Sequence, residues 1–161
     1  MIKCEVILSV SYKIYRDLKL KHVLVRGRTD LIEVKDAASN YFEDPEFRKD
    51  IRFLVDLDEF SDARAYFKEV FSLKGFYQRG FGILDRPIDV AISAPSDLGY
   101  GISHIFYMLM LDRTTMNVEN FPSISEALTW LQVDRIEFES LKRREFLGSR
   151  AKVKSLWALP S

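Results

Sequence analysis

Cysteine is almost missing from this 161-residue chain, since Cys4 is the only one. A single cysteine can form neither an internal disulfide nor a cysteine-based zinc site, and such scarcity is typical of proteins in a reducing compartment. The first residues also show no basic region followed by a uniformly apolar core and a small-residue cleavage site. We therefore expect a cytoplasmic protein.

Net charge and long apolar runs are missing as well. The chain has 24 Lys or Arg and 24 Asp or Glu residues, so no overall field attracts nucleic acid. The longest apolar run, residues 102–111, contains His104 and falls short of the ~20 residues that span a bilayer. With 47% hydrophobic and 30% charged residues, the composition is that of one globular domain with its own core. We expect no nucleic-acid partner and no membrane span.

The stretch 88–110 organises the rest of the prediction. An apolar run of alternating β-branched and small residues ends at Pro95, which cannot donate to a strand ladder. Ser96 can cap a following helix, and Asp97 places negative charge at its positive end. The pattern predicts a buried strand over 88–94, a tight turn, and a helix packed against the strand.

Further strands are predicted before and after this unit, some paired in a hairpin and others separated by helices. Residues 4–15 alternate in polarity, and a short connection leads to a second apolar run at 22–26, which predicts an antiparallel hairpin. Further apolar runs at 51–57 and 116–121 predict single strands separated by helices. The expected fold is α/β: a five-stranded mixed sheet with an edge hairpin, then repeated helix–strand units with packed helices.

Capping signals predict where the remaining helices begin and end. Asp30 and Glu33 have the capping-box spacing for one helix, and Ser123 or Ser125 begins a short one. Ser61 or Asp58 is expected to cap another, which Gly75 would end. Residues 76–87 then form an aromatic-rich connection.

The C-terminal part differs from the body in charge. Residues 135–161 hold seven Lys or Arg against three Glu, a net charge of +4, so residues 1–134 carry −4. We divide the chain into a domain over 1–133 and a basic amphipathic helix or arm over 134–161. This extension either folds back on the acidic body or contacts a partner, and attraction between the −4 body and +4 tail of two copies favours a homodimer.

Two acidic residues directly follow a predicted strand, Asp56 and Asp58. Acids at the carboxyl end of such a strand lie where ligands often bind, and their oxygens suit Mg²⁺. The spacing also resembles the first motif of haloacid-dehalogenase-type phosphatases, but that family's later motifs have no match here. Helix capping is the preferred interpretation, and a Mg²⁺-dependent phosphatase is the weaker alternative.

The two histidines and the serines at expected helix starts do not form a recognisable catalytic or metal-binding group. Apart from His104, the chain has only His22, which excludes a multi-histidine metal site, and no Ser or Cys lies one helical turn from His104. We expect His104 to be a partly buried structural residue. Ser61 and Ser96, at expected helix starts, could bind an anion or accept a phosphate. We predict no catalytic residue and no cofactor.

An ordered set of segments resembles the bacterial SpoIIAA-like proteins, whose fold is shared by STAS domains and, more loosely, by CRAL-TRIO lipid binders. The segments are the hairpin ending at Gly27, DPEFR at 44–48, FLVDL at 53–57, VAISAPSDLGYG at 90–101 and SEALTWL at 125–131. The resemblance covers roughly residues 4–132 and implies a five-stranded mixed sheet without implying an enzyme. Anti-anti-sigma factors of this fold carry an Asp-Ser-Ser-Gly-type phosphoacceptor, whereas the corresponding region here, DEFSDAR at 58–64, has only Ser61.

The leading functional hypothesis is therefore a non-enzymatic regulatory or protein-interaction module of this fold. Its partner would bind a helix surface or a shallow pocket formed by Ser61, Pro95, Ser96, Asp97, Gly99, Tyr100, Gly101 and His104. The alternative is a small-molecule or lipid binder with a pocket built from Phe67, Phe71, Phe76, Tyr77, Phe81, Phe106 and Tyr107.

Overall fold

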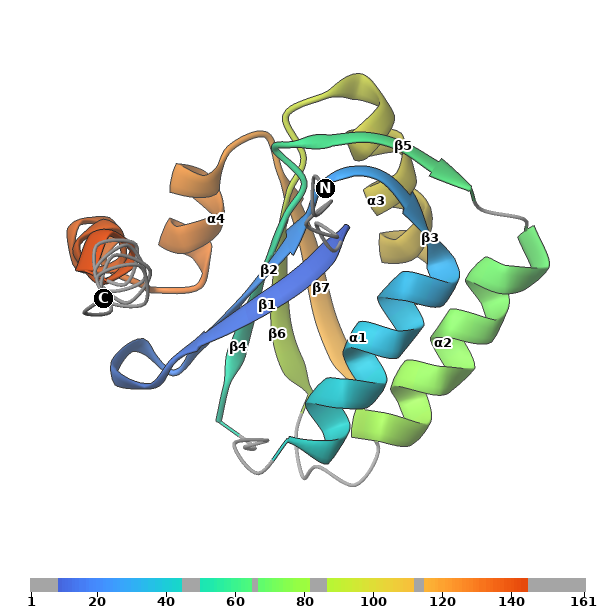
Figure 1. Ribbon diagram of the computed structural model, residues 1–161, viewed down its shortest axis with the longest axis horizontal. Coiled ribbons are helices and arrows are strands. Elements are labelled where there is room, and N and C mark those ends of the chain that lie inside the picture. Colours follow the sequence, from blue (N-terminus) through green and yellow to red (C-terminus); the bar gives the residue numbers. More distant parts are fainter. Residues whose placement is uncertain (1–8, 45–49, 65–66, 82–86, 112–114, 145–161) are drawn as a thin grey trace, which may run out of the picture.

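The computed structural model describes residues 9–44, 50–64, 67–81, 87–111 and 115–144 (Figure 1). For residues 31, 62–64 and 67–71 it describes the backbone alone. The expected strand over 4–15 is thus seen only in its second half, and its first residues lie outside the described part.

A five-stranded mixed sheet forms the centre of the molecule, which confirms the predicted α/β architecture. Its spatial order is β1-β2-β4-β6-β7, and only β1 runs antiparallel to its neighbour. The edge hairpin is also confirmed, with a single 3₁₀ turn between its two strands. The strands are β1 (Val10–Tyr15), β2 (Leu20–Val25), β4 (Arg52–Asp56), β6 (Ile88–Ser93) and β7 (Met116–Phe121).

Helices cover both faces of this sheet (Figure 1). One face carries α1 (Leu31–Glu43), α2 (Phe67–Phe81) and α3 (Asp97–Leu109). The other carries α4 (Ile124–Trp130) and a helix over residues 135–144. Because side chains alternate along a strand, each strand contributes to two separate cores. The α1–α3 core includes Val90 and Phe53, whereas the α4 core includes Ala91 and Leu54.

Local capping chemistry begins three of these helices as predicted. The Asp30 side chain accepts from the backbone of α1 while Glu33 accepts from the Asp30 N–H, so the capping box is present. Ser96 Oγ accepts from Gly99 N at 3.0 Å and begins α3. Ser123 Oγ accepts from Glu126 N at 3.3 Å and begins α4, which decides between the two serines expected there.

The prediction that a helix begins at Asp58 or Ser61 is wrong. Instead of a helix capped by Ser61 or Asp58, the chain forms β5 (Phe60–Arg64), which pairs in parallel with β3 (Gly27–Asp30) in a small second sheet. The pairing joins segments more than thirty residues apart in the sequence. Local propensity carries no information about such a distant partner, and the tertiary contact overrides it.

The predicted end of the following helix at Gly75 is also wrong. α2 continues through Gly75 to Phe81, so the first part of the expected aromatic connection is helical. Its aromatic side chains pack on α1, and a Cβ at Gly80 would lie only 2.1 Å from the Phe42 ring. Glycine in this helix therefore permits close approach of α1 and α2, which offsets its poor helix propensity.

Candidate functional site

The turn between β6 and α3 brings together most of the predicted binding residues. Pro95, Ser96, Asp97, Tyr100 and Gly101 are exposed there. Gly99 is buried, and Phe60 of β5 lies close to it. A Cβ added at Gly99 would be 3.7 Å from the Phe60 ring.

Ser61 and His104 lie at the edges of this group. Ser61 is exposed on β5, the strand that packs against α3, and it is not at a helix start. His104 was expected to be partly buried, but it is exposed. It stacks between Tyr100 and Tyr107, with ring centroids 6.1 and 5.8 Å away, because these three residues follow one another along a single face of α3.

Asp56 is held in a buried polar network on the α4 side of the sheet. One carboxylate oxygen lies 2.9 Å from His22 Nε2 and the other accepts from Asp58 N at 3.0 Å. Burial opposes ionisation, but the bonds from His22 and Asp58 outweigh it and lower the Asp56 pKa. Both oxygens are thus used within the fold, which favours a structural role.

Asp58 differs from Asp56 in its surroundings. Ser93 Oγ donates to it at 3.2 Å, while desolvation and the negative charge of Asp56 raise its pKa. Among the residues that the structure describes, no group of three or more His, Cys, Asp or Glu side chains could hold a metal ion. The two aspartates link β4 to β2 and β6.

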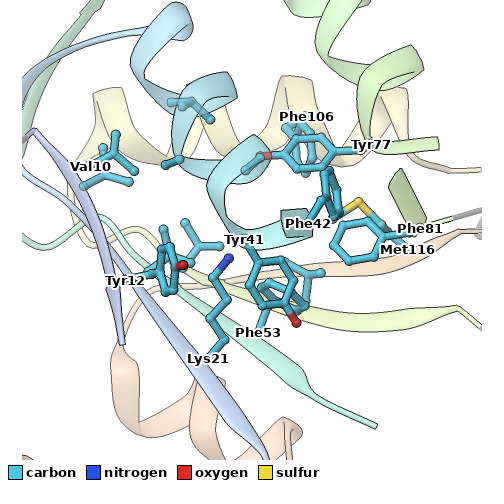
Figure 2. Close-up of a pocket in the computed structure, with 17 residues that line it drawn as sticks. Val10, Tyr12, Lys21, Tyr41, Phe42, Phe53, Tyr77, Phe81, Phe106 and Met116 are labelled. Atoms are coloured by element: carbon cyan, nitrogen blue, oxygen red, sulfur yellow. The ribbon is translucent and has the colours of Figure 1, made fainter. Parts of the chain in front are cut away.

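A cavity of about 90 Å³ lies on the opposite face, between the sheet and α1–α3 (Figure 2). Its wall is almost entirely aliphatic and aromatic. The residues are Val10, Tyr12, Lys21, Val23, Val25, Val34, Ala37, Ala38, Tyr41, Phe42, Phe53, Val55, Tyr77, Phe81, Val90, Phe106 and Met116. Of the wall residues that the structure describes, Lys21 is the one whose side chain can carry a positive charge.

The Lys21 amine is enclosed by aromatic rings. Nζ lies 3.4 Å from the ring centre of Tyr41, 4.3 Å from that of Tyr12 and 5.0 Å from that of Phe53. Figure 2 shows it pointing between the first two rings. Desolvation lowers the pKa of Lys21 to about 6, and the negative charge of Asp44 opposes this shift only in part.

Asp44 interacts with Tyr12, whose ring lies beside the lysine. The Tyr12 hydroxyl donates to Asp44 at 2.8 Å. Burial, this bond and the charge of Asp44 raise the pKa of Tyr12 to about 12. Within the described ranges, the Lys21 amine has neither a hydrogen bond nor an ion pair, so its polar contacts are limited to ring faces.

A second cavity of about 180 Å³ adjoins the first and extends toward β3, β5 and α3. The two share five wall residues: Val25, Val34, Val55, Tyr77 and Phe106. Among its described wall residues, those with polar side-chain groups are Thr29, Asp30, Tyr77 and Ser103. Together the cavities form an apolar compartment with an amine at one end.

The aromatic residues expected to build a pocket meet only in part. Tyr77, Phe81 and Phe106 line the first cavity. Phe76 instead packs on Phe42, and Tyr107 stacks on His104. The side chains of the other two, at positions 67 and 71, lie outside the described residues.

Lys21 was missed by the sequence analysis, although a signal was present. The second strand was expected to begin at residue 22, so Lys21 lay outside it, in the short connection between the strands. β2 begins at Leu20, and alternation then places Lys21 on the same face as Val23 and Val25. A lysine in phase with one buried and one partly buried valine indicates an inward-pointing amine.

Neither the comparison with protein-family models nor the comparison with curated proteins finds a match for this chain. Within the described residues, none of the helices has the length and apolar character needed to cross a bilayer.

Proposed function

We propose that this protein binds a small apolar molecule in the compartment between the sheet and α1–α3. The observation that carries the proposal is the pair of adjoining cavities, about 90 and 180 Å³, with almost wholly apolar walls. A well-packed core leaves few voids larger than a water molecule. A dry apolar cavity of about 150 Å³ is already large enough to bind benzene.

The size and wall chemistry indicate the class of ligand. A benzene-sized ring or a short alkyl chain fits the larger cavity, and aromatic faces such as Tyr77 and Phe106 offer edge or stacking contacts. Most of the binding free energy would come from removing apolar surface from water. Because the wall belongs to three helices and all five strands of the main sheet, ligand binding would also stabilise the fold.

We also propose that the fold is SpoIIAA-like. Support comes from the strand order with its antiparallel edge hairpin and from helices on both faces. A binder of this fold would have the sheet as its rigid floor and the helices as its cover.

Toluene tests the binding proposal directly. We expect toluene to raise the melting temperature of the wild-type protein. At a toluene concentration one hundred times its Kd, the free energy of unfolding should increase by about 2.7 kcal/mol. Val55→Phe places a larger side chain in the wall of both cavities and should abolish this shift. Ile136→Phe is the matched control, because Ile136 is 81% exposed and lines neither cavity.

A toluene titration that leaves the wild-type melting temperature unchanged contradicts the proposal. Native mass spectrometry of the purified protein gives a second readout, since a retained cellular ligand would appear as an added mass in wild type and not in Val55→Phe.

Exposed apolar residues on α3 favour a second function, protein interaction. Leu98, Ile105 and Met108 lie along one side of the helix, each about half exposed, and Leu111 follows beyond its end. This stripe continues the predicted Pro95–Gly101 surface, and exposed apolar patches of this kind mark interaction sites. Sedimentation of wild type and an Ile105→Asp/Met108→Asp variant tests it. A wild type that is monomeric at all concentrations and salt levels contradicts self-association.

A further inference from the structure

The Lys21 amine is placed where a bound molecule would meet it. Only 4% of the residue is exposed, and its Nζ points into the smaller cavity, next to the larger one. Most buried amines are paired with a carboxylate, because an isolated charge is costly away from water. Here the described surroundings supply the ring faces of Tyr12, Tyr41 and Phe53. The amine is therefore left available to an occupant of the cavity.

The amine is also in a reactive form near neutral pH. Burial lowers the Lys21 pKa to about 6, so the neutral amine with its free lone pair predominates at pH 7. Desolvation in an apolar pocket is a recognised way to activate a lysine as a nucleophile. An ordinary exposed lysine, with a pKa near 10.4, is almost entirely protonated at that pH.

We propose that Lys21 captures an apolar aldehyde or ketone in this compartment as a reversible imine. The Nζ lone pair forms a bond to the carbonyl carbon, while the carbonyl π electrons move to oxygen. Oxygen gains a proton and nitrogen loses one, which gives a neutral carbinolamine. Loss of its hydroxyl group as water, together with the remaining N–H proton, forms the C=N bond. The reaction needs no oxidant or reductant, and hydrolysis reverses it.

A carbonyl fits this site better than a carboxylate. A carboxylate would have to lose its hydration and would draw a proton onto Lys21, so that two charges were buried in an apolar wall. The cost of burying such a pair can exceed its mutual attraction. A carbonyl and a neutral amine bring no net charge, and the apolar tail can extend past the shared wall residues into the cavity of about 180 Å³.

This inference rests on the proposed binding function, and one experiment separates the two. The probe is hexanal, added to wild-type protein at pH 7 with cyanoborohydride, which reduces an imine to a stable secondary amine. Peptide mapping by mass spectrometry then locates the modified lysine. We expect Lys21 to be modified at least about tenfold faster than exposed lysines, and excess toluene to slow this reaction.

Two substitutions give matched controls. Lys21→Met replaces the amine with an apolar side chain of similar length and should remove the fast adduct. Lys19→Met alters a lysine two residues away that is exposed and paired with Asp50, and it should leave the fast adduct unchanged. Because the mapping is done on wild-type protein, the test holds even if Lys21→Met folds poorly.

The outcomes are distinct. Fast modification of Lys21 that toluene suppresses supports the imine. Toluene binding with hexanal adducts spread over exposed lysines overturns the role of Lys21 and leaves the binding function intact. Absence of both toluene binding and Lys21 modification overturns both proposals.

Discussion

Lys21 and His22 are neighbours in β2 and are both buried, with 4% and 1% exposed, yet they have opposite surroundings. His22 faces α4 and the helix over 135–144, where Asp56 lies 2.9 Å away and the Phe138 ring packs against it. Lys21 faces α1–α3, where it meets aromatic rings and a cavity. On one face the buried His22 has a carboxylate partner, whereas on the other the Lys21 amine lies against ring faces beside a cavity. We infer that the α4 face serves stability and the α1–α3 face serves binding.

The largest effect should come from Phe138, the fully buried ring on the α4 face. Phe138→Ala should lower the free energy of unfolding by about 3–5 kcal/mol, because it opens a cavity against Tyr15 and His22. Denaturant unfolding measures the loss. A loss below about 1 kcal/mol would show that the helix over 135–144 contributes little and that the two faces do not differ in this way.

Lys21 should make stability depend on pH in a characteristic direction. Its folded pKa is depressed to about 6, so above that pH the unfolded chain binds more protons and stability rises with pH until the ordinary lysine pKa is reached. Between pH 7 and pH 9 the expected gain is about 2–3 kcal/mol. Of the groups facing Lys21, Tyr12 has its pKa raised to about 12, which lies above this window, and Asp44 contributes a negative charge that raises the Lys21 pKa.

Lys21→Met should remove this slope and stabilise the protein at pH 7. Chemical denaturation at several pH values compares it with wild type, with Lys19→Met as the control that retains the slope. Equal slopes in Lys21→Met and wild type would contradict a neutral buried amine.

Asp56→Asn tests the hydrogen bond between His22 and Asp56 on the α4 face. The substitution weakens the bond to His22 and should cost about 1–3 kcal/mol at pH 7. Because the folded Asp56 pKa is depressed, its contribution is present above the ordinary Asp pKa and is lost as the pH falls below about 4. Wild type and variant should therefore converge in stability in acid, which acid titration of the unfolding free energy can follow. A gap that persists undiminished in acid would contradict the depressed pKa.

The smallest effect is expected at Ser96, the cap of the helix that covers the larger cavity. Ser96→Ala removes the bond to Gly99 N and should cost about 0.5–2 kcal/mol. Thermal unfolding detects it, and Ser61→Ala on β5 serves as an exposed serine control. An unchanged melting temperature would show that the cap contributes nothing measurable.

The five strands, the hairpin, the Asp30 and Ser96 caps and a serine cap at 123 or 125 could all be predicted because they depend on short-range patterns. Side-chain alternation and capping bonds act within a few residues, so a linear reading contains them. The same alternation, extended back to Leu20 where β2 begins, indicates that Lys21 points inward.

The β3–β5 pairing, the continuation of α2 past Gly75 and the burial of His22 against Asp56 could not be read in this way. Each depends on a partner far along the chain whose position is set by packing, and a contact with Phe42 or Phe138 overrides local propensity. The cavities are the clearest case, since a void is the volume that several elements leave unfilled when they pack together.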